Sequence, residues 1–148
     1  MTQTLPPKET VIEGVYLDVA PQFDDARGSL LVREAGHGLP FVPKRMFYLF
    51  DVPEGSKRGD HAHRTCHQLL ICLKGRVECV VDNGHERASR WLDSSNLALY
   101  MPPMVWGIQQ GYSKDAILLV LASHEFDPDD YIRSYNEFKS RALQQDRP

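Results

Sequence analysis

The chain has 148 residues, of which 42% are hydrophobic and 25% charged, a balance that excludes general disorder and suits a single globular domain over 1–148. Its formal net charge of -3 is too small to indicate binding to nucleic acid or to an anionic membrane surface. No apolar run approaches the roughly 20 residues of a membrane span, and the N-terminus lacks the pattern of a signal peptide, so we expect a cytoplasmic protein.

Short strands separated by turns make up most of the predicted structure. Residues 1–9 form a loose leader with two prolines, and Pro-Glu-Gly, Lys-Gly, Asp-Asn-Gly and Pro-Pro mark turns further on. This pattern predicts an all-β sandwich or barrel. Residues 11–19, rich in β-branched and aromatic residues, form one expected strand. The other strand-like stretches are 29–34, 44–52, 59–64, 68–74, 76–82, 97–101 and 116–123.

One α-helix, over 127–143, closes the predicted fold. Asp127 is a suitable N-cap, a proline follows it at the first helical position, and two further aspartates favour the positive end of the helix dipole. Tyr131, Tyr135 and Phe138 recur at helical spacing. We expect this apolar face to pack on the barrel or on a second subunit.

The most informative segment runs from Gly55 to Gly75 and contains His61 and His63. Residues two apart in a strand face the same side, so both imidazoles are expected to project together into the barrel mouth. The spacing of the glycines and histidines resembles the first motif of the cupins. In that motif the position of Gln68 is usually a glutamate that binds a metal.

The second cupin motif departs from its pattern as well. It falls on Pro102–Gly107, where Met104 replaces a glycine and Gly107 replaces a histidine ligand. A catalytic metal usually needs about three good protein ligands. Two histidines and a neutral amide make a poor site for zinc or iron, so we expect no metal and no other cofactor.

Without a metal, the two histidines have two interpretations. They satisfy a structural hydrogen-bond network or lie exposed, or they carry out acid–base chemistry near pH 7, one transferring a proton while the other orients it or polarises a carbonyl. The three cysteines are an odd number and do not indicate a disulfide framework. Cys72 and Cys79 lie in apolar runs and are expected to act as small hydrophobic residues.

Three segments together resemble the sugar 3,4-ketoisomerases, the WxcM-like group of the cupin superfamily. They are 44–64 (KRMFYLFDVPEGSKRGDHAHR), 97–106 (LALYMPPMVW) and 117–138 (ILLVLASHEFDPDDYIRSYNEF). The resemblance, over roughly 10–140, implies a jelly-roll (cupin) barrel, a homodimer and a dTDP-linked 4-keto-6-deoxysugar substrate. It implies that dTDP-4-keto-6-deoxyglucose becomes its 3-keto isomer, ready for an aminotransferase of deoxyaminosugar biosynthesis. It also implies that His61 is the general base and that His63 acts beside it.

Three arginines are candidates for contacts with the diphosphate or with a developing oxyanion: Arg27, Arg45 and Arg58. The alternative for each is a solvated surface charge. Gln68 and Trp106 are further candidates for substrate contact.

Tyr48 is a candidate to shuttle a proton between carbons or to hold a substrate hydroxyl, although a strand aromatic fits the core equally well. Phe50 stands where relatives often have tyrosine, and Gly107 where they often have a polar residue. These departures leave open which face of C4 receives the proton, and so whether the product is the gluco or the galacto epimer.

Three other functions compete with this interpretation. A related epimerase would use a histidine paired with an aspartate and a separate tyrosine acid. A metal-dependent cupin such as a dioxygenase would need iron. A non-catalytic cupin would only bind a sugar and regulate a partner.

Overall fold

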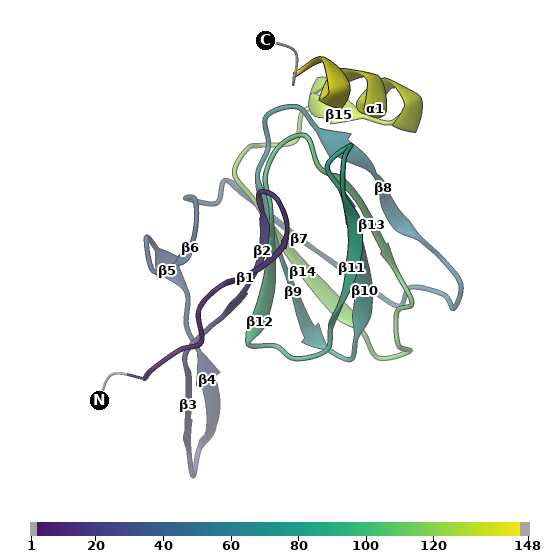
Figure 1. The fold of residues 1–148 in the computed structure, drawn as a ribbon. Coiled ribbons are helices and arrows are strands. Elements are labelled where there is room, and N and C mark those ends of the chain that lie inside the picture. The colour runs from purple at the N-terminus through teal and green to yellow at the C-terminus, as the bar shows by residue number, and fades with distance from the viewer. Residues whose placement is uncertain (1–2, 146–148) are drawn as a thin grey trace.

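The computed structural model describes residues 3–145, and its main feature is a pair of antiparallel sheets that face one another (Figure 1). The six-stranded sheet has the order β1 (Glu9–Ile12), β2 (Val15–Val19), β12 (Leu97–Met101), β9 (Gln68–Lys74), β14 (Ile117–Ala122) and β7 (Arg45–Phe50). The five-stranded sheet has the order β11 (Arg87–Leu92), β10 (Val77–Asp82), β13 (Trp106–Gln110), β8 (Arg58–His63) and β15 (Tyr131–Ile132). The predicted all-β jelly-roll fold with a C-terminal helix is confirmed.

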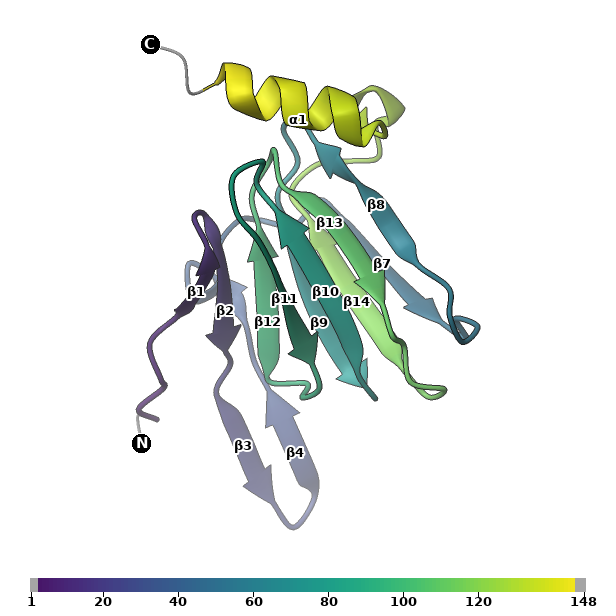
Figure 2. The same ribbon diagram turned by 45° about the vertical axis from the view of Figure 1, so that its right-hand side comes forward.

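Two smaller elements lie outside these sheets. Strands β3 (Gln22–Asp25) and β4 (Gly28–Leu31) form a hairpin that projects below the sheets (Figure 2). Strands β5 (Glu34–Ala35) and β6 (Gly38–Leu39) form a short parallel pair. Residues 3–8, in the predicted leader, have no strand or helix, and β1 begins at Glu9.

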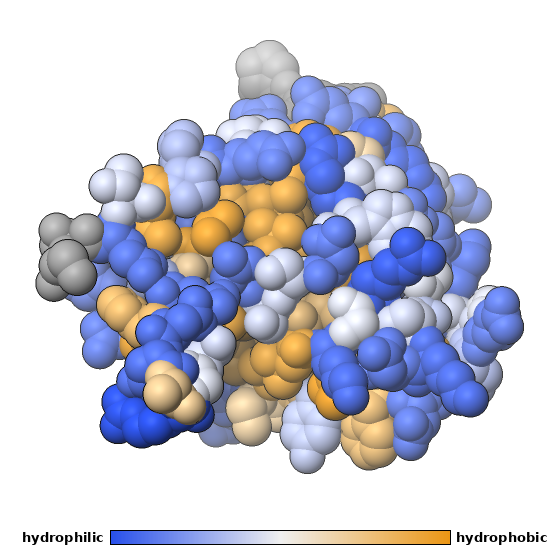
Figure 3. Space-filling view, turned by 90° about the horizontal axis from the view of Figure 1, so that it is seen from below, coloured by the Kyte–Doolittle hydropathy of each residue, from blue (hydrophilic) through white to orange (hydrophobic). Residues whose placement is uncertain are grey.

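The core lies between the two sheets and follows from the alternation of side chains along each strand. In β14, Leu118 and Val120 are almost fully buried between the sheets. In β7, Phe47 and Leu49 pack against the same core, while the alternate side chains face outward. Each buried side chain of this size contributes about 1.5–3 kcal/mol through the hydrophobic effect. Seen from below, hydrophobic residues gather in the middle of the molecule with hydrophilic ones around them (Figure 3).

The C-terminal helix begins later than predicted. The segment expected to open it contains a 3₁₀ turn over Pro128–Asp130 and the short strand β15, and α1 covers Tyr135–Gln144. Asp127 caps the 3₁₀ turn, and Ser134 caps α1 by accepting a hydrogen bond from the backbone N–H of Glu137 at 3.2 Å. The prediction of a helix from 127 was wrong because pairing of β15 with β8 overrides the local capping signals.

Helix α1 covers the upper end of the five-stranded sheet (Figure 1). Its Phe138 and Ala142 are buried against Trp106 and Ile108 of β13. No helix among residues 3–145 is long and apolar enough to cross a membrane. Cys66, Cys72 and Cys79 are all buried free thiols, as expected for structural cysteines.

Candidate active site

A cavity of about 380 Å³ lies between the two sheets, and its two walls differ in character. The wall from the six-stranded sheet is apolar apart from Gln68 and presents Phe47, Leu49, Gln68, Leu70, Met101 and Val120. The opposite wall, from the five-stranded sheet, presents Arg58, His61, His63, Gln109 and Tyr131. Lys57, just before β8, and Arg133, just after β15, also line the cavity. The structure thus brings four predicted site residues, namely His61, His63, Arg58 and Gln68, to one cavity.

A β-bulge in β8 explains why Arg58 shares this cavity with the histidines. Simple alternation would turn Arg58 and His61 to opposite faces of the sheet. However, Gly59 and His61 pair with consecutive residues of β13, which leaves Asp60 as an extra residue. Gly59 has φ 79° and Asp60 has φ 61°, in the left-handed region that a non-glycine residue seldom adopts. The bulge shifts the alternation by one residue, so Arg58 faces the cavity.

Trp106 holds this bulge from outside the cavity. Its indole Nε1 donates a hydrogen bond to Oδ1 of Asp60 at 3.1 Å. The ring is 3% exposed and packs on Tyr135 and Phe138 beneath the helix. The expectation that Trp106 contacts substrate is therefore not supported by its position, because its side chain is enclosed in the core under α1.

The two histidine rings lie close together, with centroids 5.0 Å apart and an interplanar angle of 84°. The Nδ1 atom of His61 is 3.0 Å from the carbonyl oxygen of Gly59, which can only accept, so Nδ1 carries the proton. In the same way, Nδ1 of His63 donates to Oδ2 of Asp130 at 3.0 Å. In both neutral rings the unprotonated atom is therefore Nε2. The Nε2 of His63 is buried and has no hydrogen-bond partner within the described chain.

Burial keeps both rings neutral. Desolvation lowers the pKa of His61, and the positive charges of Arg133 and Arg45 lower it further. The hydrogen bond to the Gly59 carbonyl raises this pKa but does not outweigh them. The pKa of His63 is lowered to about 4, first by burial and then by His61, although Asp130 acts in the opposite direction. At neutral pH both imidazoles are thus proton acceptors.

Asp130 is a functional residue that the sequence interpretation assigned only to a helix dipole. Its Oδ1 accepts hydrogen bonds from the backbone N–H of Thr65 at 2.8 Å and from the hydroxyl of Thr65 at 2.6 Å. Its Oδ2 accepts from His63 and from the backbone N–H of Cys66 at 3.2 Å. Burial raises the pKa of Asp130, but the hydrogen bonds from Thr65 and His63 outweigh it and hold the pKa below its usual value. Asp130 is therefore an anion that fixes the orientation of His63.

The residues present do not fit a divalent metal. His63, Cys66 and Asp130 offer ligand atoms within 4.8 Å of one another, but both oxygens of Asp130 already accept hydrogen bonds, as described above. At the positions where cupins bind metal, Gln68 presents a neutral amide and Gly107 no side chain.

Tyr131 and Arg133 are further cavity residues that the sequence interpretation missed. The ring of Tyr131 lies 4.8 Å from the ring of His61 and 4.4 Å from that of His63, measured between centroids. The guanidinium carbon of Arg133 lies 4.5 Å from the centroid of the same ring. Tyr131 was assigned to a helix face. Only the pairing of Tyr131 with His63 in the sheet reveals its place.

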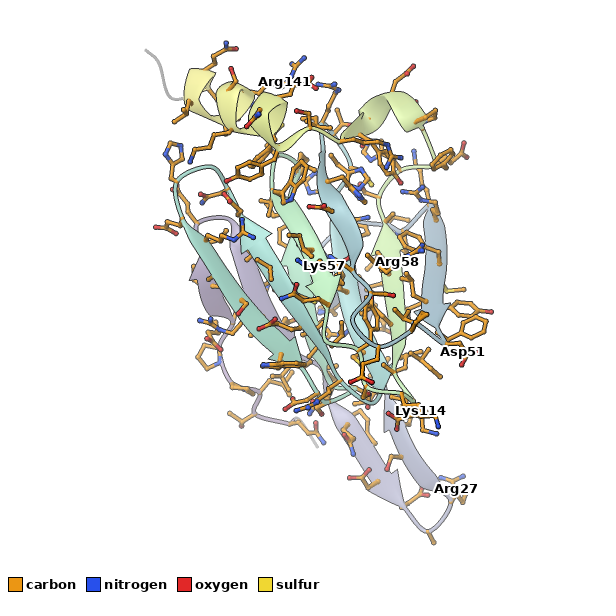
Figure 4. All side chains as sticks on the ribbon, turned by 90° about the vertical axis from the view of Figure 1, so that its right-hand side faces the viewer. Arg27, Asp51, Lys57, Arg58, Lys114 and Arg141 are labelled. Carbon is orange, nitrogen blue, oxygen red and sulfur yellow. The ribbon has the colours of Figure 1, made fainter. Side chains whose placement is uncertain are left out.

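Three other candidates lie outside the cavity wall. Tyr48 is on the outer face of β7 and is 57% exposed, because the alternate residues Phe47 and Leu49 face inward. Arg27 is at the tip of the β3–β4 hairpin, where its side chain is 90% exposed and pairs with Asp25. Figure 4 shows Arg27 far below Lys57 and Arg58.

Arg45, the third of these candidates, takes an intermediate position. Its guanidinium lies over the rings of Phe47, at 5.4 Å, and Phe126, at 5.6 Å, and its buried Nε has no hydrogen-bond partner among the described residues. It does not line the cavity, but its charge acts on both histidines.

Comparison with known proteins places this geometry in a family. The model of the FdtA family, described as WxcM-like, C-terminal, matches residues 13–142. The chain belongs to this family. The resemblance seen in the sequence is thereby confirmed.

Relatives with assigned activities are similar over most of their length. A TDP-4-oxo-6-deoxy-alpha-D-glucose-3,4-oxoisomerase of Aneurinibacillus thermoaerophilus is 41% identical over 115 residues, which are 78% of this chain and 83% of the relative. The structure of a histidine-to-asparagine mutant of QdtA, a 3,4-ketoisomerase of Thermoanaerobacterium thermosaccharolyticum, in complex with TDP-4-keto-6-deoxyglucose has a TM-score of 0.88. It is 31% identical and covers 93% of this chain and 99% of its own.

Two further structures extend the comparison. The WlaRB TDP-quinovose 3,4-ketoisomerase of Campylobacter jejuni has a TM-score of 0.84 and 33% identity, with coverage of 87% of this chain and 99% of that one. The 4-keto-6-deoxy sugar epimerase NovW of Streptomyces spheroides, at 21% identity and a TM-score of 0.73, covers 88% of this chain and 74% of its own and shares the fold alone.

Proposed function

We propose that this protein is a dTDP-4-keto-6-deoxyglucose 3,4-ketoisomerase. The observation that carries the proposal is the pair of neutral imidazoles at the cavity, each with its Nδ1 proton held by an acceptor and its Nε2 left as a base. The family and its 3,4-ketoisomerase relatives, one of them crystallised with the keto sugar, support this reaction and this substrate.

The reaction matches these residues. The hydrogen on C3 is acidic because C3 lies next to the C4 ketone. His61 removes it through Nε2 and an enediolate forms, while the unprotonated Nε2 of His63 can accept a hydrogen bond from a sugar hydroxyl and so orient it. Return of a proton to C4 leaves a ketone at C3. Hydrogens move within the sugar while no electrons leave it, so no redox cofactor is required.

Cationic side chains at the cavity suit the diphosphate of a nucleotide sugar. Arg58 is turned inward by the bulge, and Lys57 lies next to it in the lining (Figure 4). A guanidinium binds phosphate oxygens through two parallel hydrogen bonds, and a lysine adds a point charge. We assign Arg58 and Lys57 to the diphosphate, and Gln68 lines the opposite wall of the cavity.

Proton NMR of dTDP-4-keto-6-deoxyglucose with the protein in D₂O tests the function. We expect a new 3-keto sugar with deuterium at C4, because the proton held by His61 exchanges with D₂O before it is returned. His61→Asn should lower the rate of its formation by about 10²–10⁴-fold. His63→Asn is the variant for comparison with His61→Asn, since it alters the neighbouring ring and leaves the proposed base in place. No migration of the keto group with the unaltered protein would refute the proposed function. The stereochemistry at C4 in the same spectra distinguishes the gluco from the galacto product.

An epimerase is the second candidate, and one observation favours it. His63 and Asp130 form the histidine–aspartate pair expected of such enzymes. The epimerase NovW shares only the fold, whereas the ketoisomerase relatives exceed 30% identity. Deuterium at C5 as well as C3, with the ketone still at C4, would favour the epimerase over the isomerase.

We also propose a homodimer, as the family resemblance implies. Strand β7 is an edge of its sheet and exposes Met46, Tyr48 and Phe50 in a row. The β3–β4 hairpin projects from the barrel and exposes Phe23 and Leu30, although a two-stranded hairpin is at best marginally stable alone in water. A second copy of the chain that covers these surfaces accounts for both features.

Light scattering after size exclusion tests the dimer. We expect twice the chain mass of 16.9 kDa, and Phe50→Glu should shift the mass towards one chain, because it places a charge in the buried interface. Leu143→Glu, at an exposed apolar residue of α1, is the control. In a dimer, Arg27 on its projecting hairpin would reach substrate only in the cavity of the other copy.

We also propose a cytoplasmic location, which suits the three free thiols.

A further inference from the structure

The proposed isomerisation needs a group that gives a proton to oxygen as well as a base that takes one from carbon. When C3 loses its hydrogen, negative charge moves to the C4 oxygen. Later the C3 hydroxyl must lose its proton so that a ketone forms there. Neutral histidines with unprotonated Nε2 atoms supply the base that takes a proton from carbon, but they do not supply the group that gives a proton to oxygen.

Tyr131 is the only hydroxyl group among the described residues that line the cavity. Tyr48, the tyrosine expected to serve this role, lies on the outer face of β7 instead. The inward position beside it is Phe47, a ring with no hydroxyl. A phenol therefore reaches the cavity from β15 and not from β7.

The sheet holds the phenol beside both bases. Tyr131 pairs with His63 in the β15–β8 ladder, and its ring lies within 5 Å of both imidazole rings between centroids. The hydroxyl makes no hydrogen bond to any part of the described chain, so it is available to a ligand. Arg133 lies over the ring, where its charge stabilises a transient phenolate.

We propose that the Tyr131 hydroxyl is the catalytic acid of this cavity and moves a proton between the two sugar oxygens. This inference rests on the proposed 3,4-isomerisation. His61 takes the proton from C3, and the electron pair of the C3–H bond forms the C3–C4 double bond. At the same time Tyr131 protonates the C4 oxygen. The Tyr131 phenolate then takes the proton of the C3 hydroxyl, the C3 carbonyl forms, and the double-bond electrons take the proton of His61 at C4. Tyrosine and histidine both end in their starting states.

Tyr131→Phe tests this assignment, because it keeps the ring that packs on both histidines and removes only the hydroxyl. In the D₂O experiment, we expect the rate of keto migration to fall by about 10²–10⁴-fold. Affinity for TDP and the melting temperature should stay unchanged. Tyr16→Phe is the matched control, since it removes a tyrosine hydroxyl on β2 outside the cavity, and it should keep the rate of the unaltered protein.

The outcomes separate the two proposals. Keto migration by the unaltered protein with less than about a tenfold loss in Tyr131→Phe would overturn the role of Tyr131 and leave the isomerase standing. No migration by the unaltered protein would instead remove the proposed function. If Tyr131→Phe fails to fold, a fluorinated tyrosine at 131 decides the matter. A more acidic phenol should move the basic limb of the pH–rate profile to lower pH, and an unmoved limb would overturn the proposal.

Discussion

The two walls of the cavity come from the two sheets and are built on different principles. The wall from the six-stranded sheet presents side chains such as Phe47, Leu70 and Val120, and the irregularity in the pairing of β14 with β9 lies at Ile117 and Leu118, which do not line the cavity. The wall from the five-stranded sheet carries the histidines, the tyrosine and the arginines, and it contains the bulge with a left-handed Asp60.

The apolar wall gives the cavity its shape, whereas the polar wall carries its reactive groups. An apolar wall excludes water and strengthens the electrostatic interactions inside the cavity, but it has no proton to exchange. The opposite wall carries the groups proposed to transfer protons, and its bulge turns Arg58 toward the same cavity. Apolar shape and chemical function thus lie on opposite sides of one cavity.

Truncating a side chain of the apolar wall should have the largest effect, and it should lower the stability of the fold without acting on the chemical step. Leu70 is 1% exposed, so Leu70→Ala should lower the free energy of unfolding by about 2–5 kcal/mol. Chemical denaturation measures this loss. Leu118→Ala, in the same core but away from the cavity, is the control. A loss of keto-transfer rate far beyond that of Leu118→Ala would show that the apolar wall takes part in the chemistry.

Lowering the pH should destabilise the fold through His63 in the polar wall. The folded pKa of His63 is about 4 and the unfolded value about 6.5, so below pH 6.5 the unfolded chain binds more protons than the folded one. Stability is full above pH 6.5 and should fall by up to about 3 kcal/mol as pH drops to about 4. Denaturation curves across this range should show the slope, and His63→Asn should flatten it. An equal slope in the variant would contradict the assignment.

Replacing the anion behind His63 should affect reactivity more than binding. Asp130→Asn removes the charge that fixes the His63 tautomer and should lower kcat by about 10- to 100-fold. Because Asp130 raises the pKa of His63, imidazole NMR should show this pKa lower in the variant. Thr65→Val removes one hydrogen bond to Asp130 but keeps its charge, so it serves as the control. An unchanged imidazole titration in Asp130→Asn would limit Asp130 to a structural role.

The smallest expected effect concerns the bulge. Trp106→Phe removes the hydrogen bond to Asp60 and should cost about 1 kcal/mol of stability. Because the bulge aims Arg58, we expect KM for the nucleotide sugar to rise while kcat changes little. Tyr135→Phe, which removes a hydrogen bond to Asp82 under the same helix, should leave KM unchanged. Equal KM values for both variants would mean that the bulge holds without Trp106.

The sequence predicted the fold and part of the polar wall because their signals are local. Turn residues delimit the strands, and the spacing of His61 and His63 places both rings on one face. It could not predict which face of β7 lies inside, because the segment Met46–Phe50 is apolar or aromatic at every position and gives no alternation of polarity. For this reason Tyr48 was chosen although Phe47 is the inward residue.

Two other parts of the site depend on contacts distant in sequence. The bulge at Asp60 requires β13 as a partner, and a Gly-Asp pair alone does not specify it. The place of Tyr131 requires β8, and the local signals at 127–131 favour a helix start that the structure uses only for a 3₁₀ turn. Long-range pairing outweighs local propensity at both positions.

The pairing of β15 with β8 also sets the order in which the site is made. His63 and Asp130 are 67 residues apart, so a ribosome adds β8 and every other strand except β15 before it reaches the carboxylate and the phenol that finish the polar wall. A nascent chain that has not yet reached Asp127 contains every other strand and both histidines, but it lacks the anion that orients one ring and the tyrosine that packs on both. Catalytic competence in this protein is therefore acquired later in synthesis than the barrel itself.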